Sequence, residues 1–126
     1  MANELILIVE DSPKNLKLVR DVLQVRGYQT IEAGTGEEGV QMAREQRPAL
    51  ILMDIQLPGI SGVEAFHQLR ADPVTQAIPV IAVTASVMAQ ERQKVMTAGF
   101  DGFQGKPISV RELLETVRQI LDKSVH

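Results

Sequence analysis

Three acidic residues directly follow the most apolar runs of the chain, where an unpaired charge is costly to bury. Glu10 and Asp11 follow LILIV (residues 5–9), and Asp54 follows ALILM (residues 49–53). Three carboxylates brought together would repel one another, and each would raise the pKa of its neighbours unless a cation were present. Oxygen ligands without His or Cys favour a hard ion, and an incomplete carboxylate set that leaves room for water and phosphate oxygens is typical of Mg²⁺.

Further polar groups follow the later apolar runs. Thr84 ends PVIAVT, with Ala85 next, and Lys106 precedes Pro107 in the loop after GFDGF. Lys106 is a point charge for Asp54 at rest or for a phosphate oxygen during a reaction. Thr84 offers a hydroxyl group and Ala85 a backbone N–H. Each of these residues alone would be ordinary, but together they predict a phosphoryl-transfer site with Asp54 as the nucleophile.

Five apolar stretches must position these residues. Three of them are apolar throughout, which indicates strands buried on both faces, as in a parallel sheet covered by helices. The predicted strands are residues 5–9, 28–33, 49–53, 79–84 and 99–103. Ligands of an open parallel sheet bind at the carboxyl ends of its strands, so we expect the polar residues at one edge.

Start and stop signals predict five helices between and after these strands. Ser12-Pro13 marks the first start and Gly27 its end, and Ser or Thr followed three residues later by Glu predicts capping boxes. These boxes are Thr35 with Glu38, Ser61 with Glu64 and Ser109 with Glu112. A fourth helix is expected at about residues 89–98, closed by Gly99. The last helix carries an apolar stripe of Val110, Leu113, Leu114, Val117, Ile120 and Leu121. The pattern predicts a three-layer α/β sandwich with right-handed crossovers.

Composition limits the class of protein. A chain of 126 residues fits one domain, and 13 Lys+Arg against 16 Asp+Glu argues against a broad basic face for nucleic acid. The absence of cysteine excludes disulfides and thiolate metal sites. No signal-like segment or membrane-length apolar run occurs, so we expect a soluble, cytoplasmic protein with no membrane partner.

The positions and order of these residues resemble a known family. Glu10-Asp11, Asp54, Thr84, Phe103 and Lys106-Pro107 are similar to the receiver domain of two-component response regulators, of the CheY-like type. The flanking runs ILIVED, LILMDIQLPGISG, IPVIAVTA and GKPI agree, and the resemblance spans essentially all 126 residues. Among receivers, the sequence most resembles the single-domain DivK type, and it also resembles receivers at the ends of hybrid kinases. It implies one receiver domain over residues 1–126, a doubly wound (βα)5 fold with flavodoxin-like strand order 2-1-3-4-5, and no effector domain.

The resemblance also implies roles for individual residues. Asp54 would accept a phosphoryl group from a phosphohistidine on a sensor histidine kinase or histidine phosphotransferase. Glu10, Asp11 and Asp54, with the backbone carbonyl of Gln56, would bind Mg²⁺ or Mn²⁺. The phosphoryl oxygens would be contacted by Lys106, the Thr84 hydroxyl and the Ala85 backbone N–H.

The resemblance further implies that Thr84 and Phe103 are the pair of residues that switches conformation on phosphorylation. They would relay the phosphorylated state to the surface of the fourth helix, fifth strand and fifth helix, for a target protein, a phosphorelay or a phosphorylation-induced dimer. The chain would then be a signalling switch that catalyses only its own phosphorylation and dephosphorylation.

The sequence departs from the family pattern at several positions. Glu10 stands where Asp is commoner, and Phe103 replaces the commoner Tyr, so the switch must depend on ring packing. Gly105 is unusual and is expected to loosen the loop before Lys106-Pro107, which resembles a cis peptide of the family. Gln56 and Ser86 occupy positions that vary in the family that the sequence resembles, where they would tune phosphoryl lifetime.

Two alternative functions compete with this interpretation. Gly34, Gly36 and Gly39 satisfy the dinucleotide-binding fingerprint, but Glu37 and Glu38 would repel a pyrophosphate there, so a tight turn and close packing are favoured. A magnesium-dependent aspartyl-phosphate phosphatase would be expected to carry a general acid at position 56, where this chain has Gln. His67 and His126 are interpreted as non-functional, and Met88 and Met96 as packing residues.

Overall fold

The computed structural model describes residues 4–85 and 89–124, in which strands and helices alternate as predicted. The strands are β1 (Leu5–Val9), β2 (Gln29–Ala33), β3 (Leu50–Asp54), β4 (Val80–Thr84) and β5 (Gly102–Gly105). The helices are α1 (Pro13–Val25), α2 (Gly36–Gln46), α3 (Gly62–Ala71), α4 (Ala89–Thr97) and α5 (Val110–Ser124). No helix in these described ranges is both long and apolar enough to cross a membrane.

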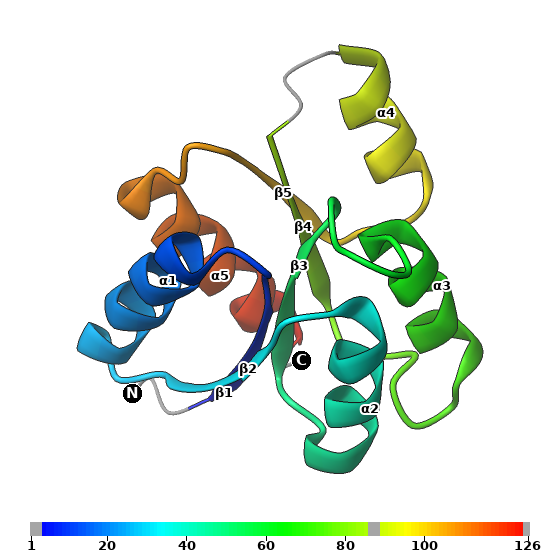
Figure 1. The fold of residues 1–126 in the computed structure, drawn as a ribbon. Helices are drawn as coiled ribbons and strands as arrows, with labels where there is room; N and C mark the ends of the chain where they lie inside the picture. Colours follow the sequence, from blue (N-terminus) through cyan, green and yellow to red (C-terminus); the bar gives the residue numbers. More distant parts are fainter. Residues whose placement is uncertain (1–3, 86–88, 125–126) are drawn as a thin grey trace.

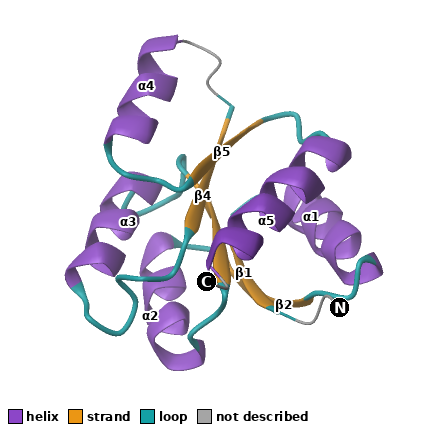
Figure 2. Ribbon diagram, turned by 180° about the vertical axis from the view of Figure 1, so that it is seen from behind, coloured by secondary structure: helices purple, strands orange, loops and turns teal. Residues whose placement is uncertain are grey.

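The strands form one parallel sheet in the order β2-β1-β3-β4-β5, so the predicted three-layer fold and strand order are confirmed. Helices α1 and α5 cover one face of the sheet, and α2, α3 and α4 cover the other (Figure 1). Figure 2 shows the same two layers from behind. Both faces are therefore dry, which explains why the central strands are apolar throughout instead of alternating.

Side chains of each central strand alternate between two buried clusters. In β1, Ile6 and Ile8 pack toward α1 and α5, whereas Leu7 and Val9 pack toward the other three helices. The same alternation divides β3 and β4 between the two clusters. Because the side chains that precede the carboxyl ends of these strands are fixed in the two clusters, the residues at those ends start from rigid positions.

The last strand begins three residues later than predicted. The left-handed Gly99 (φ 108°) closes α4, and Phe100 then leaves the sheet direction to stack on Phe66 at 4.0 Å between ring centroids. Asp101 accepts hydrogen bonds from the backbone N–H of Val80 and from Arg70, both at 2.8 Å. A packing ring and a bridging carboxylate therefore occupy the apolar-looking segment that was predicted as the start of the strand.

Most helix ends follow the predicted caps, with two exceptions. The hydroxyls of Thr35, Ser61 and Ser109 accept hydrogen bonds from the backbone N–H groups three residues on. The Glu38 carboxylate, however, accepts from the Gly34 N–H at 2.8 Å, one residue before the expected reciprocal partner. Ser12 is the N-cap residue of α1 and precedes the proline at its start, as predicted, but its side chain makes no cap hydrogen bond.

Two apolar residues are more exposed than predicted. Val110, expected in the buried stripe of α5, is the first residue of this helix and is 41% exposed. Met96 is 45% exposed on α4, so it is not a packing residue; Met88 lies outside the described residues. His67 is exposed, as predicted, and His126 lies outside the described residues.

Gly62, the first residue of α3, returns the chain to the end of β3. Its backbone N–H donates to the carbonyl of Ile55 at 3.0 Å. A Cβ atom at this position would collide with the backbone carbonyl of Asp54 and would lie 2.7 Å from the Ile55 Cα. A glycine is therefore required here by close approach, directly behind the acidic residue at the end of the central strand.

We predict that Gly62→Ala lowers the free energy of unfolding by about 1–3 kcal/mol, the usual cost of overpacking where backbone must move. Urea unfolding followed by circular dichroism would measure it. Gly34→Ala is the matched control, because an added Cβ there meets nothing within 4 Å. Equal stability of the two variants would contradict the close-approach argument.

Candidate functional site

The ammonium group of Lys106 lies between two buried carboxylates. Its Nζ is 2.9 Å from Glu10 Oε1 and 2.9 Å from Asp54 Oδ2. The two acidic side chains are only 6% and 3% exposed. The expected pair of Lys106 with Asp54 is present, whereas the equally short pair with Glu10 was not predicted. The signal for it was available, since Glu10 and Asp54 both follow strands of the same sheet edge.

The sheet register brings these residues together. Strands β1 and β3 are parallel neighbours with Val9 opposite Met53, so the residues that follow them lie side by side. The backbone N–H of Lys106 donates to the Thr84 carbonyl at 2.9 Å, which ties the lysine to the end of β4. Main-chain hydrogen bonds thus fix every element from which this cluster is built.

Each buried carboxylate is held in the same way. One oxygen pairs with Lys106, and the other accepts a backbone N–H from two residues farther along the chain. Ser12 donates this bond to Glu10 Oε2 at 3.1 Å, and Gln56 donates it to Asp54 Oδ1 at 2.9 Å. The Ser12 backbone therefore serves the acidic cluster, although its hydroxyl does not cap α1.

Burial and charge act in opposite directions on the pKa values of this cluster. Desolvation and then the hydrogen bond with Asp54 raise the pKa of Glu10, and its contacts with Lys106 and the Ser12 N–H offset this only in part. Burial alone would lower the pKa of Lys106, but the hydrogen bonds to Asp54 and Glu10 outweigh it and raise this pKa above its ordinary value. Lys106 is therefore a cation at neutral pH. The predicted crowding effect is present at Glu10, with burial as the larger cause.

Asp11 completes a group of three acids. Carboxylate oxygens of Glu10, Asp11 and Asp54 lie within 4.8 Å of one another, and Asp11 alone of the three is exposed. Such an all-oxygen set, open to solvent on one side, fits a hard divalent cation that keeps some of its water ligands. The residues present are thus compatible with the magnesium site that the sequence predicts.

The remaining predicted residues surround this cluster to different degrees. Thr84 is buried at the end of β4, and Ala85 after it is exposed. Gln56 has an exposed side chain, while Ser86 lies outside the described residues. Gly105 is the last residue of β5, opposite Thr84, so it lies in the strand and not in the loop where the sequence placed it. The Lys106-Pro107 bond is cis, as predicted.

Phe103 has a contact that the sequence did not reveal. Its half-buried ring in β5 packs against the cluster beneath α2, α3 and α4. The guanidinium carbon of Arg92, on α4, lies 4.9 Å from the centroid of this ring. Such a cation–π contact attracts the ring toward α4. No spacing rule relates a helix residue to a strand residue in this way, so sequence reasoning had no signal for it.

Two of the three glycines of the dinucleotide-binding fingerprint, Gly36 and Gly39, serve packing. A Cβ on Gly36 would lie 2.7 Å from Ile60 Cγ1, and one on Gly39 would lie 2.8 Å from Val9 Cγ2. Glu37 and Glu38 occupy the first turn of α2, as expected, where a pyrophosphate would have to bind. The close-packing interpretation is therefore confirmed for Gly36 and Gly39, but not for Gly34, where an added Cβ would meet nothing within 4 Å. None of them has the positive φ of the predicted tight turn.

Comparisons with known proteins agree with this geometry. Residues 6–118 match the family described as "Response regulator receiver domain". The polar-differentiation response regulator DivK of Brucella anthropi is 45% identical over 116 residues, which are 92% of this chain and 94% of that protein. DivK of Brucella ovis is 44% identical over the same lengths.

Solved structures show the same fold. One is the receiver domain of a sensor histidine kinase from Pseudomonas aeruginosa, with a magnesium ion coordinated in its active-site cleft. It has a TM-score of 0.89 and 31% identity, over 96% of this chain and 99% of that one. A response regulator described as putative, from Chloroflexus aurantiacus, has a TM-score of 0.91 and 29% identity, over 95% and 98% of the two chains. With its buried acids and lysine at the carboxyl edge of a 2-1-3-4-5 sheet, the chain belongs to the receiver domain family of two-component response regulators.

Proposed function

We propose that this chain, as one receiver domain over residues 1–126, is a phosphorylation-dependent switch whose phosphoacceptor is Asp54. The observation that carries the proposal is the setting of this carboxylate: it ends the central strand, is 3% exposed, and is held between Lys106 and the Gln56 N–H. A fixed, buried nucleophile next to a cation is what in-line phosphoryl transfer requires.

The donor in this proposal is a phosphohistidine on a sensor histidine kinase or a histidine phosphotransferase. A carboxylate oxygen of Asp54 attacks phosphorus, the N–P bond breaks, and the imidazole leaves with the bonding electron pair and takes up a proton from water. The product is an aspartyl phosphate. Lys106 then exchanges its contact with Asp54 for one with a phosphoryl oxygen, and the Ala85 N–H and Thr84 hydroxyl contact other oxygens of the group.

Glu10, Asp11 and Asp54, with the backbone carbonyl of Gln56, are the residues that would hold Mg²⁺ or Mn²⁺. When bound, the ion supplies positive charge that compensates the phosphoryl oxygens. Support comes from the fit of the three carboxylates and from the magnesium ion in the related Pseudomonas receiver. The chain itself would act on no external substrate, and would catalyse only its own phosphorylation and dephosphorylation.

The proposal predicts that Asp54 is the residue that becomes phosphorylated. Incubation with acetyl phosphate and Mg²⁺ should add one phosphoryl group to the intact mass of the protein, and Asp54→Asn should abolish the gain, because the amide lacks the nucleophilic oxygen. Asp21→Asn, an exposed acid on α1, is the matched control and should be phosphorylated normally. A phosphoryl group that persists in Asp54→Asn would overturn the assignment.

The same preparation separates the switch from the phosphatase alternative. A phosphatase would hydrolyse an external phosphate ester many times per protein molecule, whereas a receiver takes its phosphoryl group from a phosphohistidine or an acyl phosphate and leaves a phosphate ester intact. Release from p-nitrophenyl phosphate well beyond one equivalent would favour the phosphatase.

The output proposed for this switch runs from Thr84 through Phe103 to the surface of α4, β5 and α5. Phosphorylation adds charge beside Thr84, the hydroxyl moves to the new acceptor oxygens, and the ring of Phe103 turns into the space that it leaves. This ring has no hydroxyl group, so its two positions differ by packing and by the contact with Arg92. A target protein or a phosphorelay partner would bind the altered surface.

The second prediction tests this relay by amide NMR. Acetyl phosphate with Mg²⁺ should shift the resonances of Asp54, Gln56 and Phe103 in the natural chain. In Thr84→Ala the first two should still shift, and the change at Phe103 should be lost, because nothing moves to vacate space for the ring. Thr97→Ala, an exposed threonine on α4, should behave like the natural chain. Full shifts at Phe103 in Thr84→Ala would sink the relay.

The third prediction follows from the raised pKa of Glu10. The folded chain binds this proton more tightly than the unfolded chain, so protonation favours folding. Without divalent ions, the contribution of Glu10 to the free energy of unfolding should fall as the pH rises from its ordinary pKa of 4.5 through the raised value. Glu10→Gln should therefore flatten the pH dependence of stability across this range.

Urea unfolding at a series of pH values measures this slope. Glu45→Gln, on the exposed side of α2, is the control and should keep the slope of the natural chain. If Glu10→Gln keeps it as well, the buried carboxylate is not the group that titrates.

A further inference from the structure

The ring of Phe103 has small neighbours on its own face of the sheet. It stands opposite Ala82 in the register of β4 and β5, and Gly105 lies two residues farther along the same face. A Cβ atom on Gly105 would meet nothing within 4 Å. Within the described sheet β5 is an edge strand, so no further strand confines the ring from its other side. The sheet therefore leaves this ring room to move.

The side chain of Arg92, on α4, covers the ring instead. Its guanidinium carbon lies 4.9 Å from the centroid of the Phe103 ring. Arg92 is exposed, and it forms no ion pair with the side chains that the structure describes. Because no carboxylate shares its charge, the cation is available to the face of the aromatic ring.

Helix α4 has little apolar surface to hold it against the sheet. Among residues 92–97 only Val95 is buried, and Met96 is 45% exposed. The contact between Arg92 and Phe103 is therefore a specific link between α4 and the edge strand. Any movement of the ring away from α4 breaks this link.

We propose that Arg92 is a positioning residue of the switch: its guanidinium group holds the ring of Phe103 in the half-buried position and thereby opposes the phosphorylated state. The inference rests on the relay proposed above, in which the ring turns into space beside Thr84. Since this turn breaks the contact with Arg92, the free energy of the contact favours the unphosphorylated chain. By the same linkage, loss of the contact should favour the phosphorylated state.

Urea unfolding of four chains measures the contact without any phosphorylation. The chains are the natural one, Arg92→Gln, Phe103→Leu and the double variant. Arg92→Gln should raise the unfolding constant about two- to fivefold, which is the effect of an exposed cation–π contact. In the Phe103→Leu background the same substitution should change little, because the aromatic face is absent. Arg92→Lys keeps a cation and should retain part of the stability.

Beryllofluoride with Mg²⁺ tests the opposition to phosphorylation, because it mimics a phosphoryl group on a carboxylate without a covalent step. Arg92→Gln should bind it about two- to fivefold more tightly than the natural chain, since the contact no longer favours the unbound state. A residue that only supports the fold would lower this affinity when removed, or leave it unchanged. In Phe103→Leu, adding Arg92→Gln should leave the affinity as it is.

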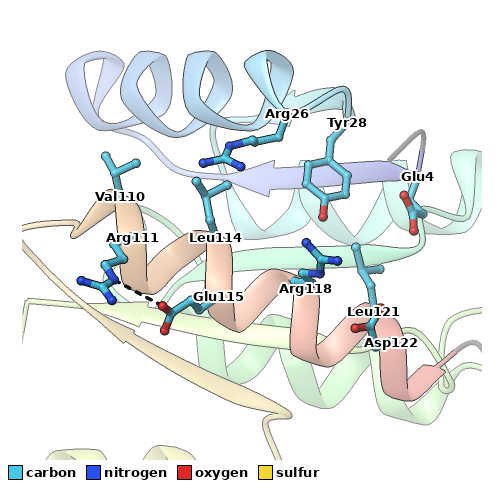
Figure 3. Close-up of a pocket in the computed structure, with 10 residues that line it drawn as sticks. All are labelled: Glu4, Arg26, Tyr28, Val110, Arg111, Leu114, Glu115, Arg118, Leu121 and Asp122. Carbon is cyan, nitrogen blue, oxygen red and sulfur yellow. Dashed lines mark hydrogen bonds and ion pairs between the residues drawn. The ribbon is translucent and has the colours of Figure 1, made fainter. Parts of the chain in front are cut away.

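A second arginine near an aromatic side chain provides the matched control. A groove of about 820 Å³ lies between α5 and the connection from α1 to β2. Arg26 and Tyr28 extend from this connection toward α5 (Figure 3). Tyr28 packs on the sheet face that α1 and α5 cover, whereas Phe103 packs on the other face. Arg26→Gln removes an exposed arginine by the same substitution and should bind beryllofluoride like the natural chain.

The two measurements fail in different ways. An equal loss of stability from Arg92→Gln with and without the Phe103 ring would overturn the proposal that this arginine holds the ring. Unchanged or weaker binding of beryllofluoride by Arg92→Gln, or an equal gain in Arg26→Gln, would overturn its opposition to the phosphorylated state. A natural chain that binds no beryllofluoride would contradict the phosphoacceptor site itself, and unfolding would still decide whether Arg92 holds the ring.

Discussion

One ammonium group compensates two carboxylates that the fold has removed from water. Lys106 contacts Glu10 and Asp54 at the same distance, and the second oxygen of each acid takes a backbone N–H. Removing two like charges from solvent is costly, and a single cation cannot neutralise both. The pKa of Glu10 is raised because Lys106 compensates only part of the free energy lost when both carboxylates are desolvated. The site therefore retains an attraction for any further positive charge that can reach it from the exposed side of Asp11.

The rest of the structure holds this arrangement in place. The acids end two adjacent strands of fixed register, and the lysine follows β5, which pairs with β4. Gly62 lets the chain pass directly behind Asp54 on its way into α3. Since both layers of helices bury every side chain of β3 and β4 and all of β1 after Leu5, little freedom remains in the backbone beneath the cluster. Phe103 lies beside this arrangement as a half-buried ring in contact with Arg92 of α4.

The sequence was sufficient for the elements, their order and the principal cluster, because each depends on local patterns or on the common edge of a parallel sheet. Glu10, Asp54 and Lys106 could be brought together before any coordinates were known. The conformation of the segment Gly99–Asp101 could not be predicted, because its sequence is typical of a strand. In the structure the ring of Phe100 stacks on Phe66, and the Asp101 carboxylate bonds to the start of β4. The contact of Arg92 with Phe103 and the bond from Ser12 to Glu10 depend on distances that no pattern in the sequence encodes.

The single tyrosine makes the intrinsic fluorescence of this protein specific to one region. The chain contains no tryptophan, and its one tyrosine, Tyr28, lies in the groove beside α5 and immediately before β2. The acidic cluster is at the opposite end of the strands. Intrinsic ultraviolet emission above the phenylalanine range therefore comes from the groove alone, with no label and no contribution from the cluster. Each region of the molecule can accordingly be followed separately in the unmodified protein, the groove by light and the cluster by mass.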